Sequence, residues 1–297
     1  MNKFRQIFPS ARPPFLILSL VCVLLGTSIA IFNGSSLNIL HLILALVGGI
    51  SAAMSVNLLN EYCDFQSGLD AKTKRTPFSG GTGWLVEHPE YSKSVFNASI
   101  VCALIPFLIG IYFAIECGPL IIYGGLLGLL IIATYTNLLN KSALLCLIAP
   151  GLGFGTLMTL GSELVQSSGL SEQGILISVI PFLLINNLLL LNQYPDIEAD
   201  KQVGRNHFPI RFGINVSNIV YGLSLMASAL VLAYLIASQA IPSLAALAFI
   251  PVMLGAVSFY GMVKYQDQVV NKLHFLGLNA ACANLTPLTL AIVLFIS

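Results

Sequence analysis

Residues 37–70 read LNILHLILALVGGISAAMSVNLLNEYCDFQSGLD, a long apolar run followed directly by a group of polar and acidic side chains. The run from 37 to 59 is long enough to cross a hydrocarbon core of about 30 Å as a helix. The group at its end contains Asn57, Asn60, Glu61, Asp64 and Asp70. The stretch therefore predicts a membrane-spanning helix that carries carboxylates to one surface of the bilayer.

The whole chain repeats this apolar character. Of its 297 residues, 57% are hydrophobic and 8% are charged, whereas a soluble domain has about 25% charged residues. The net charge of +1 provides no field that would attract nucleic acid. We therefore expect an all-α, polytopic membrane bundle of about nine transmembrane helices, folded as a single domain over residues 1–297. The apolar runs cover residues 13–32, 37–59, 94–115, 119–135, 143–162, 173–191, 216–238, 242–263 and 273–296.

The basic residues sort to one side of such a bundle. With nine spans, one set of exposed segments contains every Lys and Arg, and the other contains only Glu116, Glu163 and Glu172. Positively charged loops stay in the cytoplasm, so the acidic group of residues 57–70 is predicted to lie on the cytoplasmic side. The basic set is Lys3, Arg5, Arg12, Lys72, Lys74, Arg75, Lys93, Lys141, Lys201, Arg205, Arg211, Lys264 and Lys272.

A second acidic group follows the sixth apolar run. Residues 192–200 read NQYPDIEAD, so Asn192 and Asp196 repeat the four-residue spacing of Asn60 and Asp64. On a helix, residues three, four and seven apart share a face, which aligns Asn192, Asp196 and Asp200 unless Pro195 kinks or ends that helix. Acids at the end of one span commonly just solvate a loop. Two groups with the same spacing on the same side indicate a shared site.

The chemistry of that site follows from its oxygen ligands. Carboxylates held this close repel one another unless a cation lies between them. Mg²⁺ binds through a few carboxylates and completes its coordination with water and phosphate oxygens. We therefore predict a Mg²⁺ cofactor with a phosphorylated ligand. The predicted metal ligands are Asn60, Glu61, Asp64, Asp196 and Asp200.

Basic side chains follow each acidic group and suit a diphosphate. Lys72, Lys74 and Arg75 follow the first, and Lys201, Arg205 and Arg211 follow the second. Cations that contact a metal-bound diphosphate stabilise it as a leaving group. The apolar bundle interior suits a long hydrocarbon, so the predicted substrate is a polyprenyl diphosphate. The turn-rich segment 76–83 is either a lid over this ligand or an ordinary connector.

Several polar residues have two open interpretations. Asn57 either contacts the ligand or bonds a neighbouring span, as asparagine in membrane helices often does. Tyr135, at the end of the fourth run, either faces the pocket or belongs to the interfacial aromatic belt. His207 lies in the second long loop and either contacts diphosphate or is simply exposed.

Two other functional classes compete with this prediction. An ion-coupled transporter also contains intramembrane acids, but these usually lie near the middle of a span. No predicted span has an Asp, Glu, Lys or Arg near its centre. A membrane phosphotransferase acting on lipid alcohols would show one dense run of aspartates with Gly and Arg, which this chain lacks.

The two motifs together resemble those of the UbiA superfamily of intramembrane prenyltransferases. That family has an N-D-x-x-D-x-x-x-D motif after its second helix and D-x-x-x-D after its sixth. Here Asn60-Glu61-x-x-Asp64 and Asp196-x-x-x-Asp200 take those places, with Glu in place of the usual Asp and the last acid, Asp70, two positions late. The form Asn-x-x-Asn-acid-Tyr-x-Asp-x3-Gly-x-Asp looks like the branch that contains 1,4-dihydroxy-2-naphthoate prenyltransferases of menaquinone synthesis.

The resemblance implies an activity and roles for individual residues. It implies Mg²⁺-assisted ionisation of a polyprenyl diphosphate and attack of the resulting carbocation by an aromatic acceptor, with 1,4-dihydroxy-2-naphthoate as the expected acceptor. Another aromatic or lipid acceptor is the alternative. The implied catalytic acids are Asp64, Asp70, Asp196 and Asp200. The implied substrate-binding residues are Asn57, Asn60, Lys72, Arg75, Tyr135, Asn192, Lys201 and Arg205. The expected location is the cytoplasmic (inner) membrane of a bacterium, with the active-site loops on the cytoplasmic side.

Overall fold

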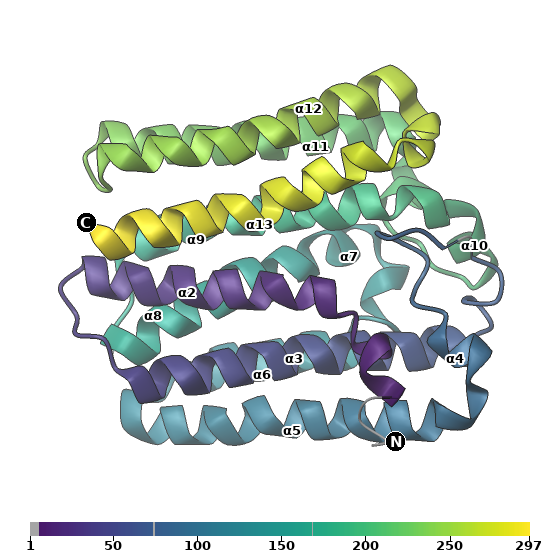
Figure 1. Cartoon of the computed structure of the whole chain (residues 1–297), viewed down its shortest axis with the longest axis horizontal. Helices are drawn as coiled ribbons and strands as arrows, with labels where there is room; N and C mark the ends of the chain where they lie inside the picture. The colour runs from purple at the N-terminus through teal and green to yellow at the C-terminus, as the bar shows by residue number, and fades with distance from the viewer. Residues whose placement is uncertain (1–5, 74, 168) are drawn as a thin grey trace.

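The structure is a computed structural model that describes residues 6–73, 75–167 and 169–297. Lys3, Arg5 and Lys74 of the predicted basic set lie outside these residues. Every regular element within the described ranges is a helix, and the long ones lie roughly parallel to the long axis of the molecule (Figure 1). The principal elements are α2 (Ile17–Phe32), α3 (Ile39–Gln66), α4 (Trp84–Glu87), α5 (Ser92–Cys117), α6 (Leu120–Thr134), α7 (Ala143–Pro150), η5 (Gly151–Met158), α8 (Thr159–Ser167), α9 (Glu172–Asn192), α10 (Ile197–Gln202), α11 (Phe208–Ala237), α12 (Phe249–Tyr265) and α13 (Leu273–Ile296).

Eight helical segments of the described chain are long and apolar enough to cross a membrane. They are Phe8–Phe32, Ile39–Gln66, Pro89–Cys117, Ala143–Ser167, Glu172–Gln202, Phe208–Ala237, Ser243–Asn271 and Leu273–Ile296. The remaining predicted run, 119–135, forms the 15-residue helix α6. At 1.5 Å per residue α6 is about 22 Å long, short of a full span. It starts behind Gly118 and Pro119 and stops before a series of turns at Tyr135, which limits its length.

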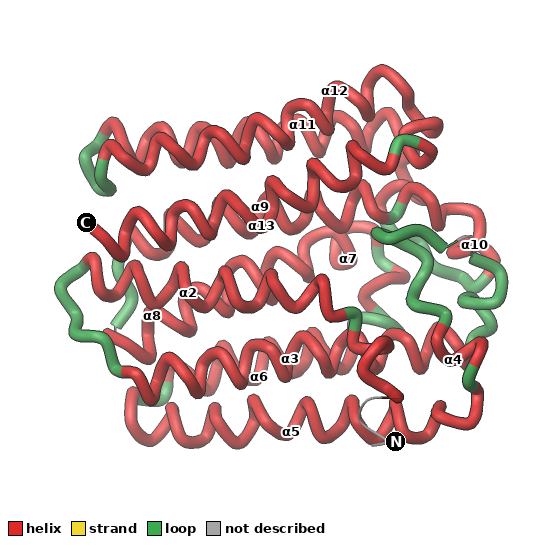
Figure 2. The backbone as a smooth tube through the Cα atoms, in the orientation of Figure 1, coloured by secondary structure: helices red, strands yellow, loops and turns green. Residues whose placement is uncertain are grey.

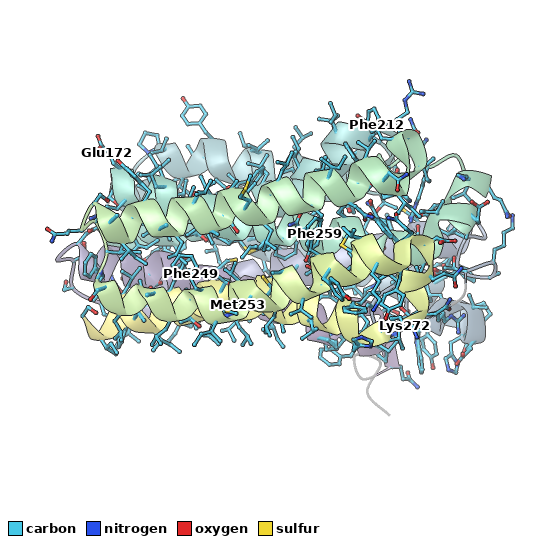
Figure 3. All side chains as sticks on the ribbon, turned by 90° about the horizontal axis from the view of Figure 1, so that it is seen from above. Glu172, Phe212, Phe249, Met253, Phe259 and Lys272 are labelled. Carbon is cyan, nitrogen blue, oxygen red and sulfur yellow. The ribbon has the colours of Figure 1, made fainter. Side chains whose placement is uncertain are left out.

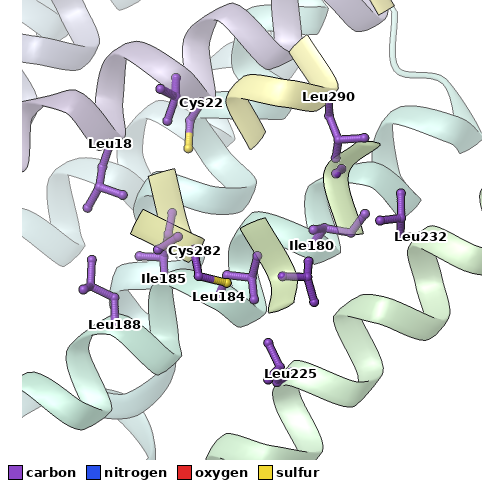
Figure 4. Close-up of a cluster of buried hydrophobic side chains, with 14 of the residues drawn as sticks. Leu18, Cys22, Ile180, Leu184, Ile185, Leu188, Leu225, Leu232, Cys282 and Leu290 are labelled. Atoms are coloured by element: carbon purple, nitrogen blue, oxygen red, sulfur yellow. The ribbon is translucent and has the colours of Figure 1, made fainter. Parts of the chain in front are cut away.

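The main hydrophobic core lies among α2, α9, α11 and α13, with α12 packed beside them. Figure 4 shows Leu18 and Cys22 of α2 gathered with Ile180 and Leu184 of α9 and Cys282 of α13. The outer faces are also apolar: Met253 of α12, labelled in Figure 3, is 66% exposed. Large apolar side chains on both the inside and the outside are what a bundle solvated by lipid requires.

Glycines bring the helix of residues 143–167 close to α9. A Cβ at Gly155 would lie 2.6 Å from the Cα of Phe182, and the Gly151 amide donates to Asn186 Oδ1 at 2.7 Å. Two small residues four positions apart let helix backbones approach in a membrane. This part of the helix has π-helical hydrogen bonding, η5, between α7 and α8. The close contact positions α7 and η5 beside the C-terminal half of α9, from which the second acidic group extends.

The long connections gather at one end of the bundle. Figure 2 shows the loops before α4 and after α10 together at the end where α10 lies. Figure 3 places Lys272 toward this end and Glu172 at the opposite one. The Arg205 side chain bonds both Asp64 and Asp200, so the two acidic groups lie at the same end of the bundle.

Candidate active site

The first acidic group lies on α3 and on the turn that ends it. Helix α3 continues to Gln66, so Asn57, Asn60 and Asp64 share one face, as the spacing predicted. Gly68, at φ +73°, then reverses the chain, and the Leu69 amide donates to the Asp64 carbonyl at 3.0 Å. Glycine adopts this left-handed conformation without steric cost. The reversal returns Asp70 to the face that contains Asp64, and both side chains are buried.

The second acidic group leaves the helical line, as Pro195 predicted. Helix α9 ends at Asn192, a 3₁₀ turn covers Tyr194–Asp196, and α10 begins at Ile197. Proline has no amide hydrogen and therefore does not continue the α-helical bonding of the preceding turn. The resulting bend places Asp196 and Asp200 beside α3, where both line the same cavity as Asp64.

Arg205 joins the two groups. Its Nη1 donates to Asp200 Oδ1 at 3.0 Å, and its Nη2 donates to Asp64 Oδ1. His207 Nε2 lies 3.0 Å from Asp200 Oδ2, and its ring is only 2% exposed. The possibility of an exposed His207 is therefore wrong. A planar guanidinium can bond two carboxylates at once, which holds α3 and α10 in a fixed arrangement.

A second arginine, Arg12, lies at the start of the chain's first span. Its Nη2 donates to Asn60 Oδ1 at 3.0 Å and lies 3.8 Å from Glu61 Oε2. Its backbone is left-handed, at φ +51°, a strained conformation for a residue with a side chain. Glu61 is fully buried, and both Thr82 groups, the amide and the hydroxyl, donate to its carboxylate. Glu61 thus anchors the segment that follows Arg75.

The segment 76–83 covers the site, which is the position expected of a lid. The Gly80 amide donates to Asp196 Oδ2 at 3.0 Å, so this segment of the first loop contacts the second acidic group directly. Gly81 has φ +67°, and a Cβ there would lie 3.3 Å from the Asp70 carboxyl carbon. Phe78, Ser79, Gly80 and Gly81 all line the cavity. Glycine permits the turn and also lets the backbone approach the carboxylates.

Several buried oxygens of the site have no hydrogen-bond partner within residues 6–73, 75–167 and 169–297. They include Asp70 Oδ2, Asp196 Oδ1 and Asn192 Oδ1. The pKa of Asp70 is raised to about 7, first by burial and then by the carboxylates of Glu61 and Asp64, with Arg12 and Arg205 opposing. A cation would favour the charged form of this acid. Unpartnered oxygens on two acidic groups therefore fit a hard divalent cation such as Mg²⁺.

The ion cage is not complete from protein side chains alone. Over the described ranges, no three His, Cys, Asp or Glu residues are arranged as a metal-binding group. Arg205 bonds Asp64 and Asp200, while Thr82 bonds Glu61. This arrangement suits an ion that arrives with phosphate oxygens as its other ligands.

A cavity of about 920 Å³ opens between the two groups and continues into the bundle. It reaches from Asp64, near the end of α3, to Leu44, near its start, which is about 30 Å along a helix. Helix α6 forms one wall. It packs mainly on α5, and none of its residues is buried, because one side faces the cavity and the other faces outward. The deep walls are apolar, as a hydrocarbon tail requires.

The structure brings together most, but not all, of the predicted site residues. Those that line the cavity are Asn57, Asn60, Asp64, Asp70, Tyr135, Asn192, Asp196, Asp200 and Arg205. Tyr135 therefore faces the pocket, and Asn57 also donates to the Ala11 carbonyl at 2.9 Å. The other predicted residues do not line the cavity. Lys72 is exposed, and Glu61 is fully buried outside the cavity lining. Arg75 pairs with Glu87, and Lys201 pairs with Glu198.

The structure places several of the predicted cations and one predicted metal ligand away from the cavity. We expected Lys72, Arg75 and Lys201 to contact diphosphate and Glu61 to bind metal, because they adjoin the acidic motifs in sequence. On α10, Lys201 lies one residue beyond Asp200 and so points to another face of the helix. The cations at the cavity are instead Arg12 and Arg205.

Sequence reasoning did not predict Arg12, Asn140 or Gln193 as site residues and left two interpretations open for His207, and all four line the cavity. Gln193 adjoins the second motif and Arg12 precedes the first span, so position in the sequence could have suggested both. Nothing in the sequence singles out Asn140, because its place depends on how the turns after α6 fold back. The Asn206 amide donates to the Asn140 carbonyl at 3.0 Å and fixes that place.

Comparison with known proteins gives a consistent assignment. The model of the UbiA prenyltransferase family matches residues 19–294. The 1,4-dihydroxy-2-naphthoate octaprenyltransferase of Bacillus subtilis is 31% identical over 68% of this chain and 64% of its own length. Proteins of the same name from Haemophilus influenzae and Escherichia coli are each 27% identical, over 76% and 74% of their lengths. The chain thus spans just under two thirds of the Bacillus protein.

Solved structures share the fold. A UbiA homolog from Aeropyrum pernix K1 superposes with a TM-score of 0.72 at 16% identity, covering 95% of this chain and 97% of that one. A UbiA homolog from Archaeoglobus fulgidus bound to GPP and Mg²⁺ superposes with a TM-score of 0.64 at 13% identity, covering 98% of this chain and 100% of that one. Because the family match covers nearly the whole chain, this protein belongs to the UbiA prenyltransferase family, and its apolar spans make it an integral membrane protein.

Proposed function

We propose that this protein transfers a polyprenyl group from polyprenyl diphosphate to an aromatic acceptor, with Mg²⁺ as the cofactor. The acceptor we propose is 1,4-dihydroxy-2-naphthoate, as in menaquinone biosynthesis. The observation that carries the proposal is the meeting of two acidic groups across Arg205, at the mouth of a 920 Å³ cavity with apolar walls. Such a site is complementary to a charged diphosphate joined to a long hydrocarbon chain.

Relatives and structural neighbours support the substrates. The three curated relatives described above are named 1,4-dihydroxy-2-naphthoate octaprenyltransferase. The Archaeoglobus fulgidus homolog was solved with Mg²⁺ and either DMAPP or GPP. We therefore place the diphosphate of this chain's substrate between α3 and α10 and its tail along α6.

Each group of residues has a distinct part in the proposed reaction. Mg²⁺ bound at Asn60, Asp64, Asp70, Asp196 and Asp200 would neutralise charge on the leaving diphosphate. Arg12 and Arg205 add positive charge at the same place. The segment 76–83 covers the head group, and the apolar walls exclude water that would otherwise quench an allylic carbocation. Glu61 has a supporting part, because its bonds with Thr82 hold the covering segment.

The proposed location follows from charge. Lys72, Arg75, Lys141, Arg205 and Lys272 all lie in connections at the end that carries the active-site loops. Lys and Arg remain on the cytoplasmic side of membranes. We therefore propose that the protein lies in the cytoplasmic membrane of a bacterium with this end in the cytoplasm.

The experiment that tests the function compares lipid quinones, by mass spectrometry, in cells with and without the protein. Menaquinone should disappear without it and return when the wild-type chain is supplied. Purified protein with Mg²⁺, 1,4-dihydroxy-2-naphthoate and a prenyl diphosphate should release diphosphate and form the prenylated ring. An unchanged quinone pool, together with no transfer to this acceptor in vitro, would refute the acceptor and direct attention to another aromatic or lipid acceptor.

A further inference from the structure

Two amide side chains form an unexplained polar patch in the cavity wall. Asn140 is 6% exposed and Gln193 is 8% exposed, and both line the cavity. Asn140 Oδ1 and Gln193 Oε1 are buried and have no hydrogen-bond partner among the residues that the structure describes. A buried acceptor without a donor costs roughly 1–3 kcal/mol, so such groups usually bind something. Neither residue belongs to the acidic motifs.

The patch adjoins the diphosphate site but lies on a different wall. Asn140 is in the turn after α6, and its carbonyl accepts from the Asn206 amide, one residue beyond Arg205. Gln193 follows α9 directly, and its Nε2 lies 3.3 Å from Cys146 Sγ on α7. The two amides therefore lie between α7, the end of α9 and the loop that carries Arg205.

Apolar side chains lie beside them in the cavity wall. The backbone N–H of Asn140 donates to the Tyr135 carbonyl at 3.1 Å, and the backbone N–H of Gln193 donates to the Leu189 carbonyl at 3.0 Å. Tyr135, Leu189 and Cys146 all line the cavity with them. A cavity wall that combines apolar side chains with two hydrogen-bond acceptors suits an aromatic ring that has hydroxyl groups. It does not suit a hydrocarbon tail, which offers no donor.

A diphosphate cannot satisfy these oxygens either. Its own oxygens are hydrogen-bond acceptors, so it needs N–H groups or cations, which Arg12, Arg205 and the Gly80 region supply. The unpartnered carboxylate oxygens of Asp70 and Asp196 suit a metal ion. Neutral amide oxygens set apart from them need a ligand that donates, and a hydroxyl is the donor that an aromatic acceptor offers.

We propose that Asn140 and Gln193 form the acceptor subsite and that their side-chain oxygens accept hydrogen bonds from two ring hydroxyls of an aromatic diol. The inference rests on the proposed function, and it assigns a binding site within that function. The two amides are positioning residues: they hold the ring beside the diphosphate site and select hydroxylated rings over those without hydroxyls.

The test uses the full-length protein and acceptors that differ only in their hydroxyls. The probes are 1,4-dihydroxy-2-naphthoate and its two mono-methyl ethers and dimethyl ether. Asn140→Leu and Gln193→Met keep side-chain size and remove the amide. Each variant should raise KM for the diol about tenfold, the effect of one lost hydrogen bond, and change KM for prenyl diphosphate less than twofold.

A cycle of variants and ethers isolates the contact. One mono-methyl ether should bind wild type and Asn140→Leu equally, and the other should bind wild type and Gln193→Met equally. Asn284→Ala is the matched control, because Asn284 Oδ1 is also buried and unpartnered but does not line the cavity. It should leave KM for the diol unchanged.

Equilibrium binding of the same probes to the wild-type protein tests the inference without variants. The diol should bind about tenfold more tightly than either mono-methyl ether. Equal binding of the diol and the dimethyl ether would overturn the proposal. So would variants that raise KM for prenyl diphosphate instead of KM for the acceptor. If the wild type neither binds nor prenylates any aromatic diol while transferring to another acceptor, the proposed function itself fails.

Discussion

Arg205 bonds Asp64 across 141 positions of sequence, and the same guanidinium bonds Asp200 at 3.0 Å. One side chain thus ties the end of α3 to α10, two elements that contain the separate acidic groups. Arg205 is 17% exposed and both carboxylates are nearly buried, so solvent screens these ion pairs weakly. The active site consequently depends on Arg205 for its shape as well as for its charge.

Replacing Arg205 should remove most activity. Arg205→Ala leaves Asp64 and Asp200 buried and unpaired, and we expect turnover to fall by roughly a hundredfold or more. The turnover of Arg205→Lys should fall less than that of Arg205→Ala, because an ammonium keeps the charge but lacks the planar guanidinium that bonds both acids. Initial rates of prenyl transfer measure this. Arg211→Ala is the control, since Arg211 is exposed nearby. Equal activity in wild type and Arg205→Ala would contradict a central part for Arg205.

Chelation should stop the reaction, and Mg²⁺ should restore it. Asp196→Asn removes the charge of an acid whose Oδ1 is unpartnered, so the Mg²⁺ concentration for half-maximal rate should rise at least about tenfold. Asp196→Ala and Asp64→Ala should each lower turnover roughly a hundredfold or more. Metal titrations of the initial rate measure both effects. Glu198→Gln, at an exposed carboxylate two residues from Asp196, should behave as wild type. Full activity in EDTA would rule out the metal.

Filling the deep cavity should shorten the accepted tail. A Cβ at Gly125 of α6 meets no atom within 4 Å, and Gly125 lines the cavity. Gly125→Phe should therefore retain transfer from short prenyl diphosphates and lower kcat/KM for long ones at least about tenfold. Leu130→Phe is the control, because Leu130 is 58% exposed and does not line the cavity. Competition between short and long substrates, read by mass spectrometry, measures the ratio. An unchanged ratio would place the tail elsewhere.

Two neighbouring glycines should differ in their effect on stability. A Cβ at Gly155 would lie 2.6 Å from the Cα of Phe182, so Gly155→Ala forces η5 and α9 apart. We expect a loss of roughly 1–3 kcal/mol in stability, the usual effect of overpacking. A Cβ at Gly153 meets nothing within 4 Å, so Gly153→Ala should leave stability nearly unchanged. Thermal unfolding in detergent compares them, and equal stabilities would contradict the close packing.

The membrane spans were the feature that the sequence predicted best, because they appear as long apolar runs. A helix in lipid must satisfy its backbone internally, so hydropathy alone locates the spans. Run 119–135 is the informative exception, because it forms the 15-residue α6 and relies on α5 for support. Hydropathy reports that a segment is apolar; it does not report where Gly118 and the turns at Tyr135 will limit the helix.

Local spacing also identified the acids. Asn60 and Asp64 share a face because they are four residues apart on α3, and Pro195 ends the helical line before Asp196. The sequence was a poorer guide to which Lys and Arg side chains reach the site. Lys201 adjoins Asp200 but faces away to Glu198, whereas Arg12, far away in sequence, bonds Asn60. Adjacency in a chain says little about which side chains meet.

The sequence by itself determined the membrane bundle, its two acidic groups and the family to which it belongs. These features depend on hydrophobicity and on spacing within single helices, which are local properties. Only the tertiary structure decided that Arg205 joins the two groups, that Gly80 contacts Asp196, and that Asn140 and Gln193 share a cavity wall. Those contacts form between segments far apart in the chain, and side-chain packing between helices selects them.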